Sequence, residues 1–249
     1  MSEDWGPGFF TGLLRELWRQ ANPPKRSAEE AGFLEAMLAA KAGAPLLDLP
    51  CGEGRLALEL ARRGYSLTGL DANPALLRTA HTHARRGGLA CTGRRGDLRT
   101  LPGDWVGAFA GAFCMGNSFG TFPPEDSAVF LREVGAVLQP GAHLVLDTDV
   151  SAEGLLPELE HRVWEPVGEL RVLVENHYDY EESRLDTTYT VLKGARRETR
   201  TARHWVLTIG EIRRMLRAAG LEPLAQYGSL ECDPFDYGGR RLLLGAEKV

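Results

Sequence analysis

The chain has 249 residues, of which 43% are hydrophobic and 25% charged, and this balance excludes a disordered or fibrous protein. Asp and Glu number 34 against 29 Lys and Arg, so the net charge of −5 disfavours nonspecific binding of nucleic acid. The four cysteines have neither disulfide-framework nor zinc-ligand spacing, which favours reduced thiols in a cytoplasmic protein and predicts no metal site. The acidic N-terminus, Met1 to Trp5, and the lack of a long apolar run lead us to expect neither export nor membrane insertion.

Two helices are predicted at the start of the chain. Apolar residues at helical spacing indicate a helix over residues 9–20, which an Asn-Pro-Pro sequence then ends. Ser27 and Glu30 have the spacing of a capping box, which predicts a second helix over residues 28–41. We expect residues 1–42 to form an N-terminal helical cap.

Short apolar runs alternate with helical patterns from Gly43 to Asp149. Strands are predicted at residues 46–49, 66–70, 89–92, 108–115 and 143–147, and helices at 55–63, 74–86 and 125–138. Such alternation indicates parallel strands covered by helices on both faces. We expect an α/β fold with a Rossmann-like, doubly wound and mostly parallel sheet, which two later strands complete to seven.

The pattern changes after residue 150. Residues 162–207 are rich in β-branched and aromatic residues and contain short polar turns, which predicts an antiparallel meander. Thr208 and Glu211 then have capping-box spacing before a helix that ends near Gly220, and strands are predicted near 222–227 and 241–245. The expected parts are the helical cap (1–42), a core (43–150), a β insertion that serves as a substrate lid (151–207) and the C-terminal part of the core (208–249).

A glycine-rich turn follows the first strand of the core. Gly52, Gly54 and Ala57 satisfy the spacing G-x-G-x-x-G/A, and Asp71 ends the next strand at the distance expected of a ribose-binding carboxylate. This spacing fits a nucleoside cofactor of either kind, NAD or S-adenosylmethionine.

The charges around the turn distinguish the two cofactors. Asp48 and Glu53 bracket the glycines and would repel the pyrophosphate of a dinucleotide at short range. A cofactor that carries an ammonium and a sulfonium group suffers no such repulsion. No phosphate-binding Gly-x-x-x-x-Gly-Lys-Ser/Thr sequence occurs either, so the charges favour S-adenosylmethionine.

Five segments in order resemble the motifs of class I S-adenosylmethionine-dependent methyltransferases. The segments are residues 47–61, 64–74, 96–99, 114–122 and 138–147. Residues 203–221 resemble the end of the same family more loosely. The resemblance implies S-adenosylmethionine as methyl donor, S-adenosylhomocysteine as product, and a strand-four end that faces the transferred methyl group.

The resemblance also implies a role for each cofactor-binding residue. Asp48 would lie near the methionine ammonium, Asp71 would bind the ribose hydroxyls, and Asp97 with the Leu98 N–H would bind the adenine. Gly52 and Gly54 would allow the backbone to approach the methionine moiety. The rest of the expected set is Pro50, Cys51, Ala72, Met115, Asn117 and Trp18.

Several of these assignments have a structural alternative. Met115 is as well explained by core packing, and Trp18 with its neighbours Phe9 and Phe10 fits an ordinary helix core better than a cover over the cofactor. Cys51 is expected to be a small buried side chain and not a nucleophile, because no basic partner is indicated.

Methyl transfer from a sulfonium is an in-line displacement that requires alignment of the acceptor and exclusion of water, with no catalytic triad. Asn117 and Ser118 would face the acceptor from the strand-four end. His177 and His204 in the β insertion are candidate general bases, although a plain sheet-face role explains them as well.

A small-molecule acceptor with an N or O nucleophile is the preferred interpretation. The strand-four end lacks the Asn/Asp-Pro-Pro-Tyr/Phe sequence of many nucleic-acid amine methyltransferases, and a lid over the site suits a metabolite. Arg-rich stretches at 94–99 and 196–203 keep an RNA substrate open, and a protein substrate or a catalytically silent S-adenosylmethionine-binding module are further alternatives. We expect a monomer or a homodimer without membrane or nucleic-acid partners.

Overall fold

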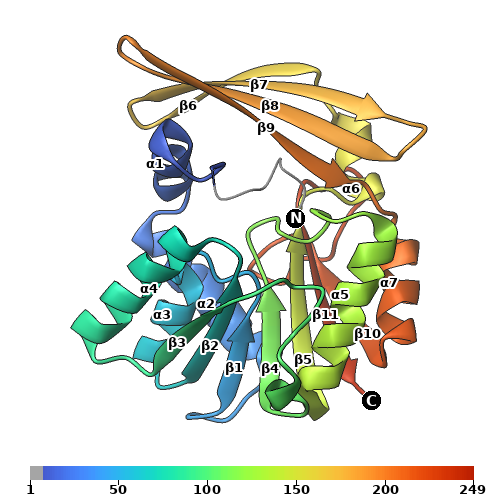
Figure 1. The fold of residues 1–249 in the computed structure, drawn as a ribbon. Coiled ribbons are helices and arrows are strands. Elements are labelled where there is room, and N and C mark those ends of the chain that lie inside the picture. The colour runs from blue at the N-terminus through green and yellow to red at the C-terminus, as the bar shows by residue number, and fades with distance from the viewer. Residues whose placement is uncertain (1–7) are drawn as a thin grey trace.

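The computed structural model describes residues 8–249, and Figure 1 shows a large sheet flanked by helices below a second, separate sheet. The segment Met1 to Trp5, on which part of the export expectation rests, lies outside the described residues. Within the described chain, every helix is too short or too polar to cross a membrane.

The large sheet has seven strands in the order β10-β11-β5-β4-β1-β2-β3. The strands are β1 (Pro45–Asp48), β2 (Ser66–Asp71), β3 (Cys91–Arg95), β4 (Phe109–Cys114), β5 (Leu138–Thr148), β10 (Leu221–Tyr227) and β11 (Leu242–Lys248). Only β11 runs antiparallel to its neighbours, β5 and β10. This arrangement confirms the predicted seven-stranded, mostly parallel α/β fold.

Helices cover both faces of this sheet because its inner strands are apolar on both sides. One buried cluster joins the sheet to α2 (Pro24–Leu38) and α3 (Arg55–Arg62), and another joins it to α5 (Pro124–Val137) and α7 (Ile209–Ala218). The helix α4 (Pro74–Gly87) contacts β3, β2 and α3. Short helical turns lie at η2 (Gly103–Trp105), α6 (Ala152–Leu155) and η3 (Leu156–Glu158).

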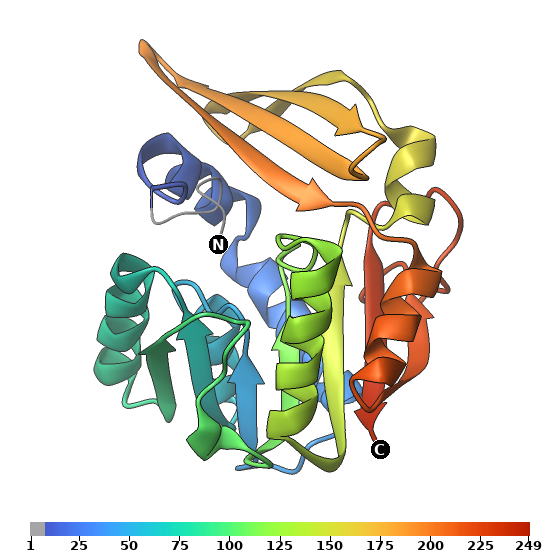
Figure 2. The same cartoon turned by 45° about the vertical axis from the view of Figure 1, so that its right-hand side comes forward.

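The β insertion forms a four-stranded antiparallel sheet, which we call the lid sheet, and this confirms the predicted meander. Its strands are β6 (Arg162–Val167), β7 (Leu170–Asp179), β8 (Arg184–Lys193) and β9 (Arg196–Trp205). The lid sheet stands above the carboxyl ends of the parallel strands in both views (Figures 1 and 2). The helix α1 (Gly12–Ala21) packs its leucines against the lid sheet, so the N-terminus contributes to the lid.

The first of the two predicted capping boxes is wrong. Helix α2 begins at Pro24, where a missing N–H costs nothing, and ends at Leu38. Ser27 therefore lies inside the helix, and its hydroxyl donates to the Pro23 carbonyl at 3.4 Å. The second box is confirmed, because the N–H of Glu211 donates to the Thr208 hydroxyl oxygen at 3.1 Å while the Glu211 carboxylate accepts from the Thr208 N–H.

Candidate active site

The glycine loop between β1 and α3 combines tight packing with open space. Gly52 and Gly54 both have left-handed φ angles, of 54° and 77°. A Cβ atom at Gly54 would lie 3.1 Å from the Cβ of Ala80, so this glycine allows close packing of the loop on α4. A Cβ at Gly52 would meet no atom within 4 Å, so Gly52 faces space that a ligand can fill.

Asp71 ends β2 and holds the glycine loop. Its Oδ2 accepts from the Gly52 N–H at 2.8 Å and its Oδ1 accepts from the Asn73 N–H at 2.7 Å. A carboxylate oxygen can accept more than one hydrogen bond, so both oxygens can still accept from ribose hydroxyls. Burial raises the pKa of Asp71, and the two backbone donors work against that shift.

Asp48 ends β1 beside Asp71, and its side chain is almost wholly buried. Burial raises the pKa of Asp48, Arg55 opposes the increase, and the neighbouring charge of Asp71 adds to it. A positive ligand group nearby would favour the ionised form of both carboxylates. The pair therefore fits an ammonium-bearing cofactor better than a phosphate.

Glu53 would repel a pyrophosphate less strongly than its sequence position predicts. Arg15 and Arg19 of α1 both pair with the Glu53 carboxylate, the latter at 2.9 Å, so most of its negative charge is offset. The case against a pyrophosphate consequently rests on the buried carboxylates Asp48 and Asp71. The same ion pairs connect the glycine loop to the helix that packs against the lid sheet.

Asp97 follows β3 and is engaged by a nearby arginine. Its two oxygens accept from Arg99 Nη2 at 2.7 Å and Arg99 Nε at 3.0 Å, and Arg99 also pairs with Asp126 at 2.6 Å. These hydrogen bonds lower the pKa of Asp97 to about 2. The half-exposed carboxylate stays ionised and can still accept from an adenine amino group, while the next residue, Leu98, is buried.

The strand-four end is tied to β5 and to the lid sheet. The Gly116 N–H donates to the buried carboxylate of Asp147 at 2.8 Å, and a Cβ at Gly116 would again meet no atom within 4 Å. Asn117 has a φ of 59°, which is rare for a residue other than glycine. Its Oδ1 accepts from the Asp149 N–H at 2.9 Å, and its carbonyl oxygen lies 3.2 Å from His204 Nε2.

The other predicted residues near this end differ in their surroundings. Met115 is buried in the cluster that joins α2 and α3 to the sheet, so its contacts support the core-packing interpretation. The Ser118 hydroxyl donates to the Met115 carbonyl at 3.1 Å. Cys51 is buried and its pKa is raised by burial, in keeping with an unreactive thiol. Pro50 and Ala72 are half-buried in the turns after β1 and β2.

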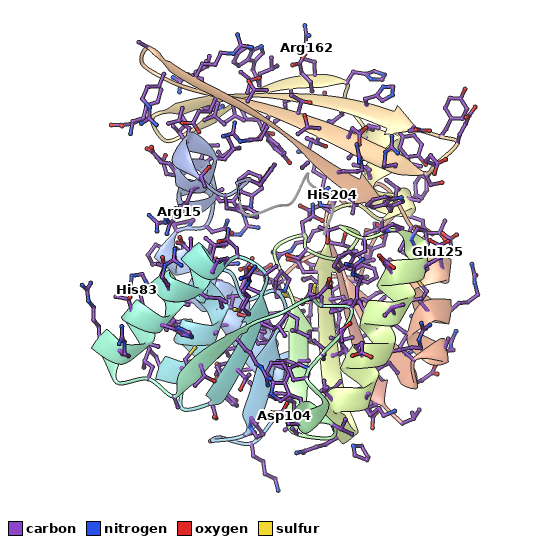
Figure 3. All side chains as sticks on the ribbon, viewed as in Figure 1. Arg15, His83, Asp104, Glu125, Arg162 and His204 are labelled. Carbon is purple, nitrogen blue, oxygen red and sulfur yellow. The ribbon has the colours of Figure 1, made fainter. Side chains whose placement is uncertain are left out.

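The structure separates the two candidate histidines. His204 is buried between the lid sheet and the core, as Figure 3 shows, and burial lowers its pKa to about 4 despite the hydrogen bond with Asn117. His177 is exposed and pairs in register with Asp186, on the outer face of the lid sheet. Alternate residues of a strand point to opposite faces, so His177 does not share the cavity that His204 lines.

A cavity of about 400 Å³ lies where the lid sheet meets the strand-four and strand-five ends. Its lining includes Asn117 and Asp149 from the core and Tyr189 and His204 from the lid sheet. This volume lies in the range of small-molecule sites. Another cavity, between α4 and β3, is lined by neither His204 nor any residue of the glycine loop.

Trp18 faces the lid sheet. Its ring lies 5.3 Å from that of Tyr189 and 5.6 Å from that of Phe10, in edge-to-face contacts. Trp18 thus takes part in the packing of α1 on the lid, and contact with the cofactor stays a prediction.

A buried network of ion pairs, which the sequence did not predict, connects the elements that carry the site. Glu30 is 1% exposed and accepts from Arg55 at 2.5 Å and from Arg241 at 2.9 Å. Arg241 also donates to Asp147, which in turn holds the Gly116 N–H. The network links α2, α3, β5 and the loop before β11. The only signal in the sequence was Glu30, which we had assigned to a capping box.

The described residues fit S-adenosylmethionine. Two glycines in left-handed conformation face open space at the ends of β1 and β4, and acidic side chains end β1 and β2. When bound, this cofactor supplies an electrophilic methyl group. No step of that chemistry demands a further protein nucleophile.

Comparisons with known proteins agree with this fit. Residues 46–141 match a protein family described as "Methyltransferase domain". The chain is 32% identical over 143 residues to the ubiquinone biosynthesis O-methyltransferase of Xanthomonas axonopodis pv. citri, and the match covers 56% of this chain and 58% of that protein. The chain thus spans little more than half the length of this curated relative.

Two solved structures share the fold over almost the whole chain. The CcbJ methyltransferase from Streptomyces caelestis has a TM-score of 0.80 at 22% identity, covering 93% of this chain and 92% of that one. CalS10, an amino pentose methyltransferase from Micromonospora echinaspora, has a TM-score of 0.72 at 20% identity and covers 95% and 97% of the two chains. Identities this low show the fold alone. The family match therefore shows a methyltransferase domain over residues 46–141, and the solved structures show that the chain shares the fold of such enzymes almost throughout.

Proposed function

We propose that the chain is an enzyme that transfers a methyl group from S-adenosylmethionine to a nitrogen or oxygen of a small metabolite. The observation that carries this proposal is the cavity beneath the lid sheet, which shares Asn117 with the strand-four end. A cofactor bound along the ends of β1, β2 and β4 would present its methyl group to this cavity. S-adenosylhomocysteine would be the product.

In this proposal the protein binds, aligns and excludes water. Asp71 binds the ribose, Asp48 lies near the methionine ammonium, and Asp97 accepts from the adenine. Gly52 and Gly116 leave room for the cofactor to approach the backbone. The lid sheet and α1 cover the reacting atoms, so that the sulfonium carbon meets the acceptor and not water.

His204 serves as a positioning residue in this account. Its Nε2 is engaged with the Asn117 carbonyl, and a pKa of about 4 makes it a weak proton acceptor at neutral pH. His204 instead couples β9 of the lid sheet to the strand-four end.

The pairing of surface arginines with carboxylates favours a small acceptor over RNA. Several arginines of the stretches 94–99 and 196–203 pair with carboxylates, among them Arg99 with Asp97 and Arg203 with Asp186. These pairs offset the positive charge that RNA would need. CalS10 is named as an amino pentose methyltransferase and the Xanthomonas relative as an O-methyltransferase, which supports a small acceptor without choosing its atom. A cytoplasmic location and a monomeric or homodimeric state remain predictions from the sequence.

Isothermal titration calorimetry with S-adenosylmethionine and S-adenosylhomocysteine tests the proposal. We expect saturable binding of both, and release of S-adenosylhomocysteine in the presence of a small acceptor. No binding at millimolar cofactor would contradict the proposal. Binding followed by methylation of RNA or protein, and not of any metabolite, would contradict the acceptor class alone.

A further inference from the structure

We propose that the acceptor is an amine that enters the cavity as an ammonium ion, held by the Asp149 carboxylate and the Tyr189 hydroxyl. This inference rests on the proposed function and adds the accepting atom and the group that receives its proton. The argument depends on two polar side chains that line the same cavity from opposite sides.

Asp149 is placed for this role by the strand ends. It directly follows β5, and its N–H donates to the side chain of Asn117 at 2.9 Å, so it is anchored next to the strand-four end. Its side chain lines the cavity, and within residues 8–249 no hydrogen bond or ion pair engages the carboxylate. Asp149 is solvent-accessible where it lines the cavity, so a positively charged donor of a ligand can reach the carboxylate and form the ion pair that the protein does not supply.

The surroundings of Asp149 leave it a usable base. Desolvation by the surrounding protein raises its pKa to about 6, Asp147 adds to the increase, and Arg241 and Arg26 oppose it. The carboxyl group is therefore mostly ionised at neutral pH and accepts a proton more readily than an ordinary aspartate.

Tyr189 faces Asp149 from the lid sheet. Its ring is fixed between Trp18 and Phe9, at centroid distances of 5.3 Å and 6.5 Å. Its hydroxyl has no hydrogen-bond partner among the described residues, and burial with the charges of Asp149 and Glu165 raises its pKa. The hydroxyl thus stays protonated and can accept an N–H or donate to a neighbouring oxygen of the acceptor.

The other charged groups of the cavity favour a cation. Its remaining carboxylates are those of Glu158, Glu160 and Glu165. Two of its three arginines, Arg26 and Arg241, are already paired with Glu30. The charge left for a ligand to balance is negative, as expected for a site that admits ammonium ions.

The proton balance also favours nitrogen over oxygen. The ammonium gives one proton to Asp149, and the freed lone pair forms the N–C bond as the S–C bond to the sulfonium breaks. The methylated amine leaves as a cation, and the Asp149 proton returns to solvent. An alcohol would need a much stronger base than a carboxylate, because its proton is far less acidic.

Paired acceptors test this assignment. Glucosamine with glucose, and 2-aminocyclohexanol with cyclohexane-1,2-diol, differ in one amino group, and mass spectrometry measures release of S-adenosylhomocysteine and the methylated product. We expect methylation of the amine member of a pair only. Asp149→Asn should lower kcat/KM for that amine by about 100-fold and Tyr189→Phe by about tenfold, while the cofactor affinity stays within about twofold.

Asp104→Asn is the matched control, because this exposed carboxylate lies at the opposite end of the core from the cavity (Figure 3). Methylation of the hydroxyl member, rejection of every amine by a protein that binds the cofactor, or full amine activity in Asp149→Asn would each overturn the assignment. If Asp149→Asn does not fold, the acceptor pairs and Tyr189→Phe decide the question alone. Failure to bind S-adenosylmethionine would instead overturn the proposed function, and the amine assignment with it.

Discussion

In the core, parallel strands buried on both faces bring Asp48, Asp71 and Gly116 to one edge, where backbone hydrogen bonds hold them. The lid sheet is built differently. Its inner face packs on α1 and lines the cavity, whereas its outer face carries exposed groups such as Trp164 and His177. Cofactor binding therefore depends on strand geometry that tolerates little change, and acceptor choice depends on side chains of a sheet that can vary.

Breaking the buried ion network of Glu30 should have the largest effect on stability, because this network lies in the core. Glu30→Ala leaves Arg55 and Arg241 without their shared partner, and we expect a loss of about 3 to 5 kcal/mol in the free energy of unfolding. Urea denaturation measures it. A loss below about 1 kcal/mol would contradict a supporting role for this network.

The same network predicts a dependence of stability on pH. Burial alone would raise the pKa of Glu30, but Arg55 and Arg241 outweigh burial and hold that pKa below its usual value of 4.5. A lowered pKa in the folded state means that the stabilisation is present above pH 4.5 and is lost as the pH falls further. Wild-type protein should lose more stability than Glu30→Gln between pH 5 and about 3, and equal losses would contradict this assignment.

Asp71→Ala directly tests cofactor binding by the core. The variant removes the proposed ribose acceptor and frees the N–H groups of Gly52 and Asn73. We expect the calorimetric Kd for S-adenosylmethionine to rise by about 100-fold, since hydrogen bonds to a charged group contribute about 1.5 to 3 kcal/mol each. An unchanged Kd in a folded variant would show that the ribose lies elsewhere.

His204 tests the contact between the lid sheet and the core. Because burial lowers its pKa to about 4, its ring should stay neutral from pH 8 to pH 5, and its NMR signals should not titrate in that range. The stabilisation from neutral His204 is present above pH 6.5 and is lost as the pH falls toward 4. Titration near pH 6.5 would mean that the lid sheet opens in solution.

The smallest effect is expected from the contact of α1 with the glycine loop. Arg19→Ala removes a partly exposed pair with Glu53, and such pairs contribute at most about 1 kcal/mol. We expect a two- to fivefold rise in the Kd for S-adenosylmethionine with little change in stability. A larger rise would show that α1 controls cofactor binding.

The core was largely predictable from sequence because its signals are local. Leucine-rich strands, the turn glycines Gly52 and Gly54, and a carboxylate at the end of β2 each appear in a short stretch. The cavity was not predictable, since Asp149, Tyr189 and Arg241 are distant in sequence and meet only after the lid sheet folds over the core. Glu30 was misassigned for the same reason, because its partners Arg55 and Arg241 are 25 and 211 residues away.

A crystal structure with S-adenosylhomocysteine tests the central claim most directly, namely that cofactor and acceptor meet where the core joins the lid sheet. We predict the ribose hydroxyls on Asp71 and the sulfur directed into the cavity that Asn117 and Asp149 line. A sulfur atom directed away from that cavity, or a cofactor that does not contact Asp71, would contradict the account.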